Sequence, residues 1–181
     1  MYGMVNKAIQ DLVCEKFGED KWNEIKKMSD FHDDFFIGLQ SYPDALTYTL
    51  VKNASIVLGA DASVVMETFG EYWVLYTVNE GYGELMSLAG DNLPDFLDNL
   101  DMLHNRVSNL MPGLAAPQFS TRNKTEKSVE LEYRSHRQGL TPMVVGLLRG
   151  LGKRFELDCT ISHIQKKDEH HDCDVFKMEW Q

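Results

Sequence analysis

The sequence predicts an α+β fold, in which a helical lobe at about residues 1–110 precedes an α/β lobe at 115–181 that contains an antiparallel sheet. Apolar residues recur at helical spacing through the first two thirds of the chain. Residues 127–137 instead alternate between apolar and polar, as a strand does, and segments 157–164 and 173–180 indicate a hairpin. A length of 181 residues suits a single domain built from both lobes.

Glycines, prolines and polar capping residues divide the helical part into six expected helices. Their approximate ranges are 5–17, 22–28, 43–58, 61–73, 85–89 and 93–110. Asn92 or Asp91 can cap the last of these, and Met-Pro-Gly at 111–113 ends it. Residues 112–118 contain two prolines and one glycine and predict a stiff connector. A later helix is expected over 141–155, because Thr-Pro at its start combines a cap with a proline at the first turn.

Composition and charge exclude several classes of function. With 28 acidic and 18 basic residues the net charge is −10, which would repel a phosphate backbone and argues against binding to nucleic acid. No signal peptide and no apolar run of membrane-spanning length is apparent, so no membrane insertion is expected. An odd count of three cysteines does not suggest a disulfide framework, and we expect a cytoplasmic protein with reduced thiols.

One face of the strand at 127–137 changes from apolar to polar along its length. It begins with buried-type residues and then presents Tyr133, Ser135 and Arg137 at alternate positions, which share a face of a strand. Burying two hydroxyls and a guanidinium is costly unless they find partners, and an anionic ligand could accept from all three. On this pattern alone, a protein carboxylate or a strand face that has reached solvent is favoured over a ligand.

His104 lies on the apolar stripe of the helix expected at 93–110. It follows Leu97 and Leu100 by seven and four residues and precedes Val107 by three. A histidine in this position can be a packed core residue or a metal ligand. A haem would explain both patterns, since it needs an axial ligand on an apolar wall and polar donors for its two carboxylates.

The chain resembles the H-NOX domains, the haem-nitric oxide/oxygen-binding domains that include the haem-bearing part of soluble guanylate cyclase. The resemblance covers nearly the whole chain. It is carried by the start Met1-Tyr2-Gly3 with Val5-Asn6, by Phe69-Gly70 with Tyr72-Trp73, by Asn99-Leu100-Asp101 with Leu103-His104, by Ala116-Pro117 with Phe119, by Tyr133-x-Ser135-x-Arg137, and by Gly139-Leu140 with Gly146. It implies the H-NOX fold, with one haem b (iron protoporphyrin IX) bound between the two lobes.

The resemblance also implies roles for individual residues. His104 is similar to the proximal ligand of the haem iron, and Tyr133, Ser135 and Arg137 to the clamp on the haem carboxylates. Pro117 corresponds to the proline that packs on the porphyrin. Residues that match distal or distal-side packing positions are Trp73, Met143 and Val5.

The resemblance implies a non-catalytic sensor that binds nitric oxide and carbon monoxide. Family members that hold oxygen are understood to use a distal tyrosine, whereas the position counted from Gly146 is Met143, which donates no hydrogen bond. We therefore expect nitric oxide rather than oxygen to be the signal. By family analogy the output would pass to a separate sensor histidine kinase or cyclic-di-nucleotide enzyme.

A second group of metal-ligand residue types lies on the expected C-terminal hairpin. It consists of Cys159, His163, His171 and Cys173, a set chemically suited to zinc although its spacing is not that of a zinc finger. Two core thiols and a polar hairpin tip explain the same residues without a metal.

Other classes of function make different demands on the sequence. A haem oxygenase or peroxidase needs a distal acid–base pair or a thiolate ligand, and neither is evident. An oxygen- or redox-responsive haem sensor would keep the haem but not the selectivity argued from Met143. A non-haem module that binds another carboxylate would share the clamp, but it gives no reason for His104.

Overall fold

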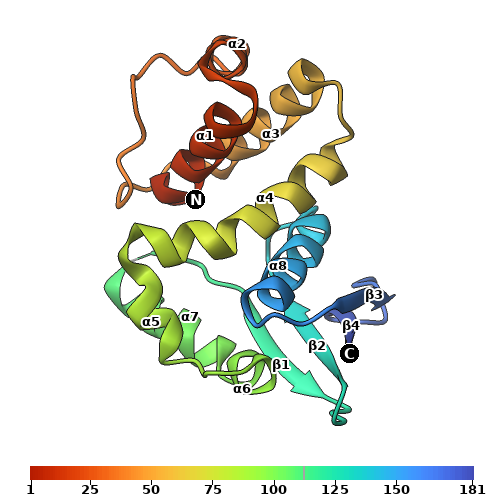
Figure 1. The fold of residues 1–181 in the computed structure, drawn as a ribbon. Helices are drawn as coiled ribbons and strands as arrows, with labels where there is room; N and C mark the ends of the chain where they lie inside the picture. Colours follow the sequence, from red (N-terminus) through yellow and green to blue (C-terminus); the bar gives the residue numbers. More distant parts are fainter. Residues whose placement is uncertain (112) are drawn as a thin grey trace. The chain divides into compact units, whose positions relative to one another are not determined.

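The computed structural model describes residues 1–111 and 113–181, and their contacts divide the chain into two compact units, Met1–Phe69 and Gly70–Gln181 (Figure 1). The boundary falls inside helix α4 (Ala62–Thr77). The change from helices to strands comes later, after residue 110, where the sequence indicates it. The boundary between the compact units therefore comes earlier than the change from helices to strands, because helices α5 to α7 are in the same unit as the sheet.

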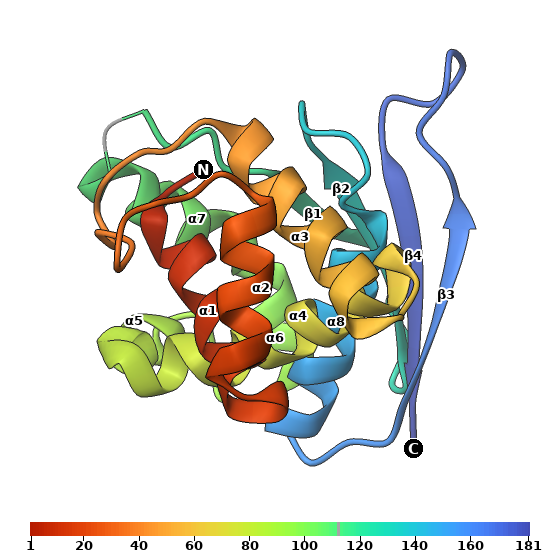
Figure 2. The ribbon, with the colours of Figure 1, turned by 90° about the horizontal axis from the view of Figure 1, so that it is seen from above.

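The first unit contains α1 (Gly3–Phe17), α2 (Glu19–Met28) and α3 (Asp44–Leu58), which pack on one another (Figure 2). Fully buried apolar residues, among them Ala8, Ile25 and Leu50, form its core. The irregular segment before α3 is fixed by Phe36, whose ring stacks on Phe31 at 4.1 Å between centroids. As predicted, α3 follows Pro43 and ends at Gly59, whose φ of 64° lies in the left-handed region that favours glycine.

The second unit places helices against a four-stranded antiparallel sheet. Its helices are a π-helical turn η1 (Val78–Tyr82), α5 (Gly83–Ser87), α6 (Leu93–Asp98), α7 (Leu100–Leu110) and α8 (Thr141–Arg154). Its strands are β1 (Gln118–Arg122), β2 (Ser128–Arg134), β3 (Cys159–Gln165) and β4 (Asp174–Trp180). The strand order is β1-β2-β4-β3, so β2 and β4 are the central pair.

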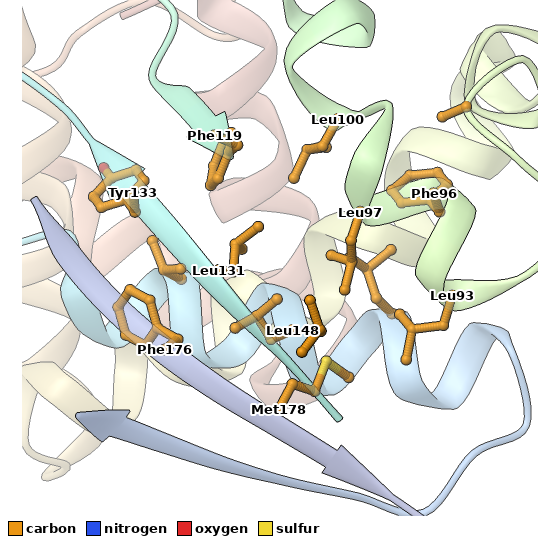
Figure 3. Close-up of a cluster of buried hydrophobic side chains, with 14 of the residues drawn as sticks. Leu93, Phe96, Leu97, Leu100, Phe119, Leu131, Tyr133, Leu148, Phe176 and Met178 are labelled. Carbon is orange, nitrogen blue, oxygen red and sulfur yellow. The ribbon is translucent and has the colours of Figure 1, made fainter. Parts of the chain in front are cut away.

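The core of this unit lies between the inner face of the sheet and helices α6, α7 and α8 (Figure 3). Leu131 of β2 and Phe176 of β4 are directly paired, and both are completely buried. They meet Leu97 and Leu148 from the helices. Alternation along β2 buries every second residue, as predicted from the sequence, because one face of the sheet is covered and the other is charged.

Several predicted elements differ from those observed. The helix expected at 93–110 is two helices, α6 and α7, separated at Asn99, whose side chain donates hydrogen bonds to the carbonyls of Ala89 and Asp95, each at 3.0 Å. Strand β1 was not predicted, and β2 ends at Arg134 rather than at 137. The C-terminal hairpin and α8 are confirmed. Pro112 of the expected connector lies outside the described residues.

Among the residues that the structure describes, no single helix is both long and apolar enough to cross a membrane. One sharply bent pair, α3 followed by α4, meets the length and composition criteria only when the two helices are taken together.

Candidate functional site

His104 lies on α7 with its imidazole oriented by its own helix. Its Nδ1 lies 2.8 Å from the carbonyl oxygen of Leu100, one turn earlier. A carbonyl can only accept, so Nδ1 carries the proton and donates. The neutral tautomer then has its lone pair on Nε2, the atom able to ligate a metal. Nothing in the sequence pattern indicated this hydrogen bond, although the i, i+4 spacing permits it.

The protonation state of His104 also suits a ligand. Burial lowers the pKa of this imidazole, and the hydrogen bond to Leu100 and the nearby Asp101 carboxylate oppose the shift without cancelling it. The neutral ring is therefore favoured at neutral pH, and this is the form in which histidine binds metals.

Phe119 connects His104 with the residues expected to bind an anion. Its ring centroid lies 5.2 Å from that of His104 and 5.4 Å from that of Tyr133, its cross-strand partner. The start of β1 is tied to α7, because the amide of Phe119 donates to the Asp101 carboxylate at 3.2 Å. Phe119 belongs to one of the motifs that carry the resemblance, but its role depends on strand β1, which has no clear signal in the sequence.

Tyr133, Ser135 and Arg137 lie near one another along the chain, but not on one strand face as predicted. Tyr133 is buried in β2, whereas Ser135 and Arg137 follow the end of the strand in an irregular segment. The hydroxyl oxygen of Ser135 accepts a hydrogen bond from the Arg137 amide at 3.1 Å. The Arg137 guanidinium donates to the carbonyl of Ala115 at 2.7 Å, which links this segment to the connector before β1. Local hydrogen bonds, rather than strand alternation, thus arrange the last two residues.

Trp73 and Met143 lie on two helices that cross at very short distance. Trp73 is on α4, where its ring stacks with Tyr76 at 5.9 Å between centroids, and Met143 is in the first turn of α8. A Cβ atom added to Gly70 would lie only 2.2 Å from the Met143 carbonyl oxygen. Gly150 faces the backbone of Glu71 in the same way, at 2.9 Å. These glycines allow the close approach, and sequence reasoning assigned them no role in it.

The remaining expected site residues lie elsewhere. Pro117 immediately precedes β1 and is partly buried. Val5 lies on α1 in the first unit, whereas His104 lies in the second.

The four residues considered for zinc have other contacts in the structure. His163 contacts Asp174 at 2.9 Å and stacks on Phe176, while His171 contacts Asp168 at 2.9 Å. Cys159 and Cys173 are partly and fully buried thiols whose pKa values are raised, chiefly by burial. In the described ranges 1–111 and 113–181, no group of three or more histidine, cysteine or acidic residues could hold a metal ion. The zinc expectation is therefore not supported.

The donor set in the second unit fits a haem. A neutral imidazole with a free Nε2 lone pair is a suitable axial ligand. A phenol, a serine hydroxyl and a guanidinium in nearby positions are suitable donors to carboxylates. The fold and these residues thus define a class of protein, a small α+β domain equipped to hold a prosthetic group.

Comparison with known proteins identifies the family. The sequence matches the Haem-NO-binding family over residues 2–163, so the chain belongs to that family of haem-based gas-sensor domains. The fold agrees with that of a crystallised H-NOX protein from S. oneidensis in its Fe(II)NO state, with a TM-score of 0.89, 20% identity, and coverage of 100% of this chain and 99% of that one. A mutant of an H-NOX protein from S. oneidensis in the Fe(II) state gives a TM-score of 0.90 at 21% identity, covering 100% and 96% of the two chains.

Curated relatives include two proteins of Caenorhabditis elegans. Soluble guanylate cyclase gcy-32 is 33% identical over 165 residues, which is 89% of this chain and 24% of the relative. Soluble guanylate cyclase gcy-35 is 30% identical over 183 residues, which is 97% of this chain and 26% of the relative. The chain thus spans about a quarter of the length of these cyclases.

Proposed function

We propose that this chain binds one b-type haem through Nε2 of His104 and acts as a non-catalytic receptor for nitric oxide. The single observation that carries the proposal is the hydrogen bond from Nδ1 of His104 to the Leu100 carbonyl. It holds the ring in one tautomer and directs the free lone pair away from the helix. Membership of the Haem-NO-binding family supports the same assignment.

Tyr133, Ser135 and Arg137 are proposed to hold the two haem carboxylates. Arg137 has five N–H donors in a fork that suits a carboxylate, and its guanidinium also donates to the Ala115 carbonyl. The Ser135 hydroxyl accepts from the Arg137 amide through its oxygen, which leaves its own proton to donate. Their task is to bind and orient the group, and Phe119 keeps Tyr133 and His104 at a fixed separation.

The gas-binding side is proposed to be apolar and to lack a donor suited to oxygen. Haem, when bound, would supply an iron able to bind a diatomic gas. Met143 offers a thioether, which accepts only weakly and donates nothing. Trp73 is proposed to line the same side, and Pro117 to pack against the porphyrin. We infer that discrimination against oxygen results from the missing distal hydroxyl.

The signal is proposed to pass to a separate protein in the cytoplasm. The class of partner that we propose is a histidine kinase or a cyclic-di-nucleotide enzyme. The partner would detect a change in the contacts of His104. Such a signal requires that the partner bind the gas-free and gas-bound states with different affinity.

An absorption spectrum tests the proposal directly. The 181-residue chain is reconstituted with haemin, reduced with dithionite, and exposed separately to nitric oxide and to air. We expect a Soret band that shifts with nitric oxide and no lasting change with oxygen. A stable change in air would contradict the selectivity assigned to Met143, and the absence of any Soret band would contradict haem binding.

A further inference from the structure

The segment that carries Ser135 and Arg137 begins where the sheet stops supporting it. The last paired residues of β2 are Tyr133, opposite Asp174, and Arg134, opposite Gln118. Beyond them the chain is irregular to residue 140, and Gly139 has a φ of 75°. Since ladder hydrogen bonds do not fix Ser135, other contacts must determine where its hydroxyl and the following amide lie.

The turn between β3 and β4, residues 166–173, supplies two such contacts. Lys167 donates from Nζ to the carbonyl oxygen of Ser135 at 2.8 Å. Arg134, the last residue of β2, donates from Nε to the Asp172 carboxylate at 3.0 Å. The hydrogen bond between Arg134 and Asp172 lowers the pKa of the Asp172 carboxyl and raises the pKa of the Arg134 guanidinium. The turn thus contacts Arg134, just before the irregular segment, and the carbonyl of Ser135, its first residue.

The turn itself is an ordered structure. The backbone amide of Lys167 donates to the Asp174 carboxylate at 3.2 Å. The Asp168 carboxylate accepts from the amides of His170 and His171 at 2.8 and 2.9 Å. Lys167 therefore extends from a fixed base toward Ser135, unlike a lysine on a mobile loop.

We infer that the β3–β4 turn is a positioning element for the haem carboxylate site, and that Lys167 is its main positioning residue. This inference rests on the proposed function. Holding the Ser135 carbonyl fixes the peptide plane between Ser135 and His136, which in turn sets the Ser135 side chain and the Arg137 amide that donates to it. Lys167 acts through Ser135 and does not itself need to reach the haem.

The release of haem measures this effect. The haemin-loaded ferric chain is mixed with an excess of apomyoglobin, and haem transfer is followed by absorbance. Lys167→Met removes the bond to Ser135, and we expect release about three- to tenfold faster, the range given by a hydrogen bond of modest net strength. Lys167→Arg keeps a donor and is expected to restore most of the wild-type rate.

Matched controls separate positioning from charge and from stability. Lys166→Met removes the same charge one residue away. Within the described residues the Lys166 side chain makes no hydrogen bond, so this variant should release haem at the wild-type rate. The thermal midpoints of the apo forms should agree, because Lys167 is exposed. Ser135→Ala keeps the carbonyl that Lys167 binds but removes the hydroxyl, so in this background Lys167→Met should speed release less than it does in the wild type.

Three outcomes would overturn the inference. Release from Lys167→Met at the wild-type rate would show that the turn does not position the site. Equally fast release from Lys166→Met would show an effect of charge alone. If the wild-type chain takes up no haemin at all, the proposed function fails and this inference with it, so the two failures are distinguishable.

Discussion

Replacing Gly70 with alanine tests the close crossing of α4 and α8. The new Cβ would lie 2.2 Å from the Met143 carbonyl oxygen, 2.9 Å from the Leu147 amide nitrogen and 3.1 Å from the Gly146 Cα. A Cβ atom essentially never lies closer than 3.0 Å to such a neighbour, so the helices must separate by at least about 0.8 Å. All three neighbours are backbone atoms, which cannot rotate away.

The expected cost lies at the upper end of the range for overpacking, about 3 kcal/mol. With a denaturant dependence of about 2 kcal/mol per molar urea, the unfolding midpoint should fall by about 1.5 M. Circular dichroism during urea unfolding of the apo chain measures this shift. Gly38→Ala is the control, because its Cβ would meet only the Met4 Cβ at 4.0 Å. A Gly70→Ala midpoint within about 0.3 M of the wild type, about 0.6 kcal/mol, would refute the argument.

Three further predictions concern the cap of α6, the protonation of His104 and the gas selectivity. Asn92→Ala removes the side chain that accepts from the Asp95 amide at 2.9 Å, and should lower the free energy of unfolding by about 1 kcal/mol in urea titrations; an unchanged value would contradict a capping role. Burial lowers the pKa of His104 below its ordinary value of about 6.5, so the apo chain should lose stability as pH falls below about 6.5, and more steeply than His104→Gln; parallel pH profiles would contradict the buried neutral ring. Met143→Tyr adds a distal hydroxyl, and the reduced, haem-loaded variant should take up oxygen from air where the wild type does not, as monitored by absorbance; a variant that still ignores air would show that this position does not set selectivity.

The general fold was predictable because its local signals agree with its packing. Three local signals agree with the observed core: the β3–β4 hairpin, the alternation along β2, and the cap and proline at the start of α8. His104 could be singled out for the same reason, since the apolar stripe of its helix is the face packed toward Leu97 and Phe119.

Tertiary contacts determine the features that the sequence did not reveal. Strand β1 has the sequence Gln-Phe-Ser-Thr-Arg, with a single large apolar residue, and is a strand because it pairs with β2. The apolar stripe continues through residues 93–110, but the helix is interrupted at Asn99, whose side-chain amide donates to the carbonyl of Ala89, ten residues earlier. Strand β2 ends at Arg134 because its neighbours begin there. Asp174 is the first residue of β4 and Gln118 the first of β1, so Ser135 has no strand residue opposite it.

The same limit applies to the candidate site. Tyr133, Ser135 and Arg137 were grouped by strand alternation, yet the last two depend on contacts from residues 22 or more positions away, Ala115 and Lys167. Gly70 and Gly150 have no distinctive local pattern, and only the crossing of α4 and α8 explains them.

The central claim is that His104 is the axial ligand, and haem retention by His104→Gly tests it most directly. The variant and the wild type are reconstituted with haemin, desalted, and compared by the ratio of Soret to protein absorbance, with and without imidazole in the buffer. We predict that the variant loses most of its haem without imidazole and regains it, with a wild-type-like spectrum, when imidazole fills the space left by the side chain. Strong haem retention without imidazole would contradict the assignment of His104 and the account built on it.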